Sequence, residues 1–96
     1  MSEGKITEQD VHMHARRAEL AQSILDNPIY KEAMERIKIQ CFEAFASVKT
    51  SDTESLIHIR LTMSVINNVE RYFERVMNDA DAAQEAFNAI INDKVI

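Results

Sequence analysis

Residues 51–77 read SDTESLIHIRLTMSVINNVERYFERVM and give the clearest indication of the fold. Ser51 and Glu54 have the spacing of a capping box, in which a serine caps a helix start and the glutamate reaches back to the capping residue. Large apolar residues then recur in two lines at helical spacing: Leu56, Ile59, Met63, Ile66, Phe73 and Met77 form one line, and Ile57, Leu61, Val65, Val69, Tyr72 and Val76 form the other. Two such lines predict a helix that is buried on two sides.

A β-strand is the alternative for residues 57–65, where apolar and polar side chains alternate strictly and many are β-branched. Such alternation is typical of a half-buried strand. A strand needs a partner, however, and no other segment of the chain offers one. It would also leave the helix-start signal at Ser51 unexplained, so we favour the helix.

The composition indicates a single small helical domain. The 96 residues include one glycine and one proline, which leaves few residues for turns and favours helices joined by short loops. A chain this short builds a modest core, and oligomerisation is a usual supplement. The single cysteine excludes an intrachain disulfide framework and fits a reducing cytoplasm. The net charge of -5 disfavours the long basic surface that binds nucleic acid non-specifically.

The fold predicted along the chain is all-α, with antiparallel helical hairpins and a long third helix. We expect a flexible tail at 1–6 and a single domain at 7–96, with helices at about 8–26, 28–48, 52–78 and 80–93. Thr7 and Asp10 resemble a second capping box, and Asn27-Pro28 is a strong helix start. The last two helices are either separate, giving four, or continuous, giving three. The apolar spacing runs on across residues 78–79, which favours one long helix.

No catalytic, cofactor-binding or metal-ligating constellation emerges from the sequence. The most distinctive local cluster is His12, His14, Arg16 and Arg17, a possible contact for an anion or nucleic acid. Histidines two residues apart on a helix point about 200° apart, so they cannot share one metal ion. Acidic residues nearby in the sequence reduce the positive charge of the cluster, so we interpret it as an ordinary solvent-exposed helix face. Cys41 lies among apolar positions and is interpreted as a small buried residue, whereas Glu70 interrupts an apolar line and could set the register between helices.

Several of these elements together resemble a group of small viral proteins. The series is Ala18-x-x-Ala21-x-x-Ile24-Leu25-x-Asn27-Pro28, then Glu32-Ala33, Phe42, Ala44-Phe45 and Thr50-x-Asp52-Thr53-Glu54, followed by a long apolar helix. It resembles small proteins that tailed bacteriophages and prophages encode among their head-assembly and packaging genes. Phe45 stands where those proteins often have tryptophan. The resemblance implies an accessory role in assembly without catalysis, and it transfers no functional residue.

The expected function is therefore a non-enzymatic phage accessory or assembly protein that acts as a helical homo-oligomer in the host cytoplasm or the virion. The expected oligomer interface comprises Ile66, Tyr72, Phe73, Met77, Phe87, Ile90 and Ile91. One alternative is a small acidic regulator or inhibitor that binds a host or viral protein. Another is a weak nucleic-acid-binding packaging factor. We expect no cofactor and, since no apolar run is long enough to span a bilayer, no membrane partner.

Overall fold

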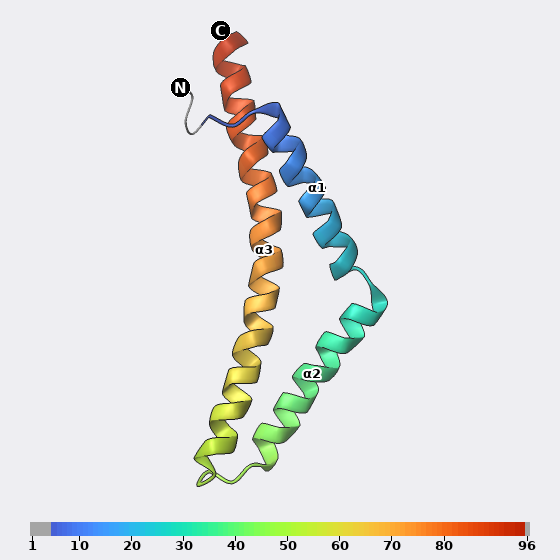
Figure 1. The fold of residues 1–96 in the computed structure, drawn as a ribbon, viewed down its shortest axis with the longest axis vertical. Coiled ribbons are helices and arrows are strands. Elements are labelled where there is room, and N and C mark those ends of the chain that lie inside the picture. Colours follow the sequence, from blue (N-terminus) through green and yellow to red (C-terminus); the bar gives the residue numbers. More distant parts are fainter. Residues whose placement is uncertain (1–4, 96) are drawn as a thin grey trace. The chain divides into compact units, whose positions relative to one another are not determined.

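The computed structural model describes residues 5–95 and shows three helices (Figure 1). These are α1 at Glu8–Leu25, α2 at Pro28–Ser47 and α3 at Thr53–Val95, and the described residues contain no strand. The predicted all-α fold is confirmed, and the strand considered for residues 57–65 is absent. The third and fourth predicted helices are one continuous helix of 43 residues. The tail predicted for residues 1–6 lies largely outside the described residues.

The starts of α1 and α2 follow the predicted capping chemistry. The backbone N–H of Asp10 donates to Oγ1 of Thr7 at 3.1 Å, and the backbone N–H of Thr7 donates back to Oδ2 of Asp10 at 3.0 Å. Oδ1 of Asn27 accepts from the backbone N–H groups of Ile29 and Tyr30 at 2.8 and 3.1 Å. Each cap satisfies N–H groups that have no partner within the helix.

The start of α3 corrects one prediction, because Asp52 is the capping residue and Ser51 is not. The backbone N–H of Ser55 donates to Oδ1 of Asp52 at 3.1 Å. Residues 49–52 form a tight turn in which the backbone N–H of Asp52 donates to the carbonyl of Lys49. This turn places Asp52 one residue before the helix, where its carboxylate also interacts favourably with the helix dipole.

Contacts divide the chain into two compact units, and α3 contributes a half to each. Unit 1 comprises Met1–Ser23 and Phe73–Ile96, and unit 2 comprises Ile24–Tyr72. In unit 1 the residues with the least exposed surface are Ala21 of α1 with Val76 and Ala83 of α3. The small side chains of Ala21 and Ala83 allow the two helices to approach closely.

Unit 2 is an antiparallel hairpin made of α2 and the first half of α3, joined by the short connection at residues 48–52 (Figure 1). Its least exposed side chains are Cys41 of α2 with Ile59 and Ile66 of α3. The interpretation of Cys41 as a small buried residue is confirmed. None of the described side chains in either unit is fully buried, and many large apolar side chains remain exposed.

Candidate protein-interaction surfaces

An ion pair crosses the hairpin of unit 2. Nζ of Lys38 on α2 lies 2.6 Å from Oε1 of Glu70 on α3, and both side chains are about half exposed. Glu70 is the residue that interrupts the apolar line of α3, and the structure gives it a partner on the neighbouring helix. Lys38 was not predicted from the sequence as the partner of Glu70. Its spacing of three residues from Cys41, which places it at the edge of the same helix face, was the available signal.

The face of α3 that points away from α2 is apolar and exposed in unit 2. We call this surface the α3 outer stripe: Ile57, Leu61, Val65, Val69 and Tyr72. Leu61 and Val65 are 60% and 61% exposed. Residues two apart on a helix lie about 200° apart around its axis. Ile57 therefore lies opposite the buried Ile59, and Leu61 lies opposite Met63, which is on the side of α3 that faces α2. The helix is therefore apolar on two sides, as predicted, but only one side is covered.

The α3 outer stripe also lies in a segment with very little charge. Between residues 55 and 69 the only Asp, Glu, Lys or Arg is Arg60. A helix that exposes one face to water normally places charged side chains there. An apolar and nearly uncharged outer face is instead typical of a surface that another protein covers.

The same line along α3 is covered by the chain itself in unit 1. Continuing from Tyr72 at helical spacing, it reaches Val76, Ala83, Phe87 and Ile90. Val76 and Ala83 are buried in unit 1, and Phe87 and Ile90 are half-buried. This line on α3 is therefore already a helix-packing surface in one half, and it lacks a covering helix in the other.

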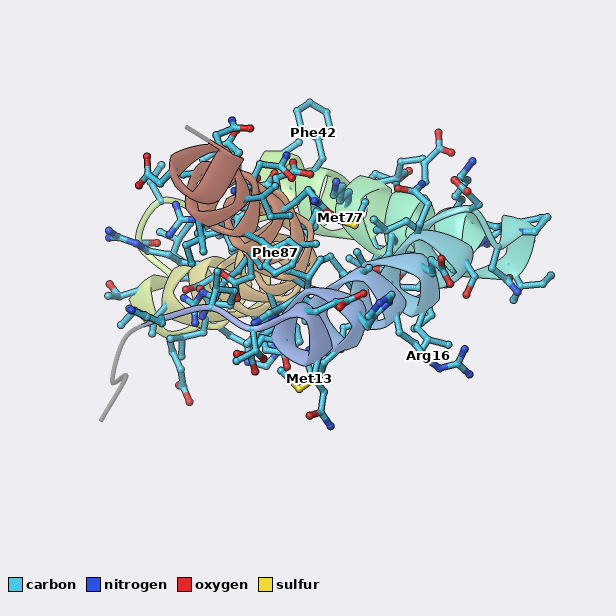
Figure 2. All side chains as sticks on the ribbon, turned by 90° about the horizontal axis from the view of Figure 1, so that it is seen from above. Met13, Arg16, Phe42, Met77 and Phe87 are labelled. Atoms are coloured by element: carbon cyan, nitrogen blue, oxygen red, sulfur yellow. The ribbon has the colours of Figure 1, made fainter. Side chains whose placement is uncertain are left out.

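A second surface of unit 2 is an apolar groove between α2 and α3, with a volume of about 390 Å³. We call it the Phe42 groove, and its lining residues are Lys38, Cys41, Phe42, Phe45, Met63, Ile66 and Asn67. Phe42 is 73% exposed and its ring projects outward from α2 (Figure 2). Phe45 and Met63 are also largely exposed. Only Lys38 and Asn67 bring polar groups to this groove, so its interior suits large apolar side chains.

The residues predicted for an oligomer interface differ in how far they are exposed within their own unit. Ile66 is buried in the seam of unit 2, while Phe73, Met77, Phe87 and Ile90 are half-buried in unit 1. Tyr72 and Ile91 are exposed. Leu61 and Val65 belong to one of the two apolar lines recognised in the sequence, but they were not among the residues predicted for the interface. The signal that could have identified them is the near absence of charge around them.

The histidine and arginine cluster of α1 does not form a single basic patch. Nε2 of His12 lies 3.6 Å from Oε1 of Glu8, one helical turn away. His14 is half-buried and close enough to Asp10 to help lower the pKa of that carboxyl, although the hydrogen bonds from Thr7 are the main cause. Arg16 projects from α1 into solvent, and Arg17 lies about 100° further around the helix (Figure 2). His12 and His14 lie on opposite sides of α1, and each is close to an acidic side chain, so the four residues do not make one continuous basic surface.

Residues 5–95 hold no group of three or more histidine, cysteine, aspartate or glutamate side chains that could bind a metal ion. Within the described chain, no helix is both apolar and long enough to cross a membrane. The chain matches no known family model, no curated protein and no solved structure.

Proposed function

We propose that this chain is a non-enzymatic helical assembly protein that forms a homodimer through the α3 outer stripe. The observation that carries the proposal is the exposed apolar line from Ile57 to Tyr72. Between residues 55 and 69 of this part of α3, Arg60 is the only Asp, Glu, Lys or Arg. The line continues into a part of α3 that already packs against a helix in unit 1. A second copy of the chain would cover the part that is bare.

The size of the α3 outer stripe supports this proposal. Five half-exposed side chains leave on the order of 500 Å² of apolar surface, which is as large as the largest patches on ordinary monomers. Two stripes pressed together remove on the order of 1,000 Å² from water, the lower limit for a specific interface. Flanking polar side chains such as Asn68 and His58 would add to this area.

A two-fold symmetric dimer suits the composition of the stripe. In such an interface the same surface meets itself, so any charge near its centre would face an identical charge. The stripe has none: its midpoint lies at Val65, and Arg60 lies to one side. An antiparallel arrangement of two α3 helices about Val65 would bring Leu61 of one copy close to Val69 of the other.

The viral role is the broader part of the proposal. It is supported by the likeness of residues 15–77 to small proteins encoded among phage head-assembly and packaging genes. A helical dimer with exposed docking surfaces suits such an accessory role, because assembly factors act by binding other proteins. We expect peptides from this chain in purified capsids or assembly intermediates of the phage that encodes it, detected by mass spectrometry.

The dimer is tested by light scattering coupled to size exclusion, over a wide range of protein concentration. We expect a dimer for the natural sequence and a monomer for Leu61→Glu, because two glutamates would be buried in the interface. Ile29→Glu is the matched control, since Ile29 is a similar side chain, 71% exposed, on α2. Circular dichroism should show helical spectra for both variants. A monomer for the natural sequence, or an unchanged dimer for Leu61→Glu, would overturn the proposal.

A further inference from the structure

The Phe42 groove has features of a binding site for an apolar helix. Its floor includes Cys41 and Ile66, both buried, and its rim carries the exposed rings of Phe42 and Phe45. The volume of about 390 Å³ is enough for two or three large side chains. Both rings come from α2, and exposed aromatic side chains beside an apolar floor are usual anchors of peptide recognition. The groove is concave, so a curved helix surface fits it better than a flat lipid bilayer does.

Positive charge flanks the groove along both helices. On α2, Lys31 precedes Lys38 by seven residues and lies near it on the same side of the hairpin. On α3, Arg60 and Arg71 lie three residues before Met63 and four residues after Asn67, which places them on the same line as these groove residues. These four side chains are four of the six lysines and arginines in unit 2: Lys31, Arg36, Lys38, Lys49, Arg60 and Arg71.

The acidic side chains of α2 line a separate depression, and only Glu35, seven residues before Phe42, shares a line of the helix with a groove residue. Glu32, Glu35 and Glu43 line a shallow depression together with Arg36, and this depression shares no residue with the Phe42 groove. On α3, Glu70 is paired with Lys38. The groove side of unit 2 therefore carries a local excess of positive charge, although the chain as a whole has a net charge of -5.

We propose that the Phe42 groove binds an amphipathic helix with acidic flanks, contributed by a protein other than this chain. The apolar floor would take the large side chains of that helix, and Lys31, Arg60 and Arg71 would pair with its carboxylates. A second copy of the same hairpin is a poor occupant, because two positively charged grooves would repel each other. Single-stranded nucleic acid fits less well, since an apolar floor with few cations offers little to a phosphate backbone.

The test uses fluorescence anisotropy with the full chain and a labelled synthetic helix of about 18 residues, with leucines on one face and glutamates flanking them. A peptide with glutamine in place of glutamate, a peptide with lysine there, and a dT oligomer of about 15 nucleotides are the comparison probes. We expect the acidic peptide to bind most tightly. Its dissociation constant should rise several-fold between about 50 and about 500 mM NaCl, because salt screens charged partners.

Matched variants locate the site on the surface. Phe42→Ser should raise the dissociation constant about tenfold, whereas Ile29→Ser should leave it unchanged, since Ile29 is equally exposed on the same helix outside the groove. Arg60→Gln should weaken binding several-fold, and Arg36→Gln, on the acidic face of α2, should have no effect. The side chains involved are exposed, so folding is expected to survive each change.

The proposal is overturned if the acidic peptide does not bind, if the lysine peptide or the oligonucleotide binds more tightly, or if Phe42→Ser and Ile29→Ser weaken binding equally. None of these outcomes depends on the α3 outer stripe. Light scattering on Phe42→Ser separates the two proposals, because the variant should remain a dimer while it binds the peptide more weakly.

Discussion

The two halves of α3 belong to one continuous helix but expose different chemistry. The half in unit 2 has a single charged residue between positions 55 and 69 and leaves an apolar line in solvent. The half in unit 1 covers its apolar line with α1 and exposes charged residues: Glu74, Arg75, Asp79, Asp81 and Glu85. A continuous helix can therefore present two different surfaces along its length. The half in unit 1 has the polar exterior of an ordinary surface helix, whereas the half in unit 2 has the apolar exterior that is typical of a protein interface.

The largest expected effect comes from placing a charge on the α3 outer stripe, compared with the same charge on the exposed face of α3 in unit 1. Val65→Glu should raise the dissociation constant of the proposed dimer at least about 100-fold, since a buried unpaired charge costs several kcal/mol. Ala82→Glu, on the exposed face of the other half, should leave it unchanged. Analytical ultracentrifugation over a concentration series measures both. Equal effects of the two variants would remove the distinction between the halves.

A second prediction concerns the close helix packing in unit 1. Ala83 is 6% exposed, and Ala83→Leu should lower the free energy of unfolding by about 1–3 kcal/mol, because there is no room for added volume. Ala82→Leu is the matched control, since the neighbouring alanine is exposed and should tolerate the change. Urea denaturation followed by circular dichroism measures the difference. A tolerated Ala83→Leu would mean that the alanines do not determine the approach of α1 and α3.

A smaller effect is expected at the ion pair of unit 2. Glu70→Gln removes the charge opposite Lys38 and should cost about 0.2–1 kcal/mol at low salt, since both side chains are partly exposed. The cost should shrink as NaCl is raised, because salt screens the attraction. Denaturation curves at low and high salt test this. A large, salt-independent loss would mean that Glu70 is held by contacts other than this pair.

The smallest expected effect is the pH dependence of the helix start at α3. Hydrogen bonds from the side chain and the backbone N–H of Ser55 hold the pKa of Asp52 below its usual range. The unfolded chain therefore takes up a proton at higher pH than the folded chain, and the cap's contribution to stability is lost as the pH falls through the lowered pKa. Asp52→Asn caps without titrating, so its stability should fall less steeply between about pH 4 and about pH 2. Thermal melts across this range test the sign, and an identical decline in both proteins would contradict it.

Local features of the sequence predicted most of the fold. Thr7, Asn27 and the apolar spacing of residues 51–77 specify helix starts and faces through contacts within a few residues, so they can be recognised without a structure. The continuity of α3 was also favoured by spacing alone. The choice of Asp52 over Ser51 as the cap was missed, because it depends on the turn at residues 49–52, which several sequences can form.

Three features could be predicted without a structure: the chain is all-α, α3 is apolar on two sides, and Cys41 is buried. Each follows from the spacing of side chains along one helix. Three other features follow from the packing of helices: which of the two sides of α3 is covered, the pairing of Lys38 with Glu70, and the groove that Phe42 and Phe45 line. These features depend on contacts between helices that are far apart in the chain. The spacing of apolar residues along one helix does not specify which other helix packs against each of its faces. The interface residues expected from sequence were drawn from both sides for that reason.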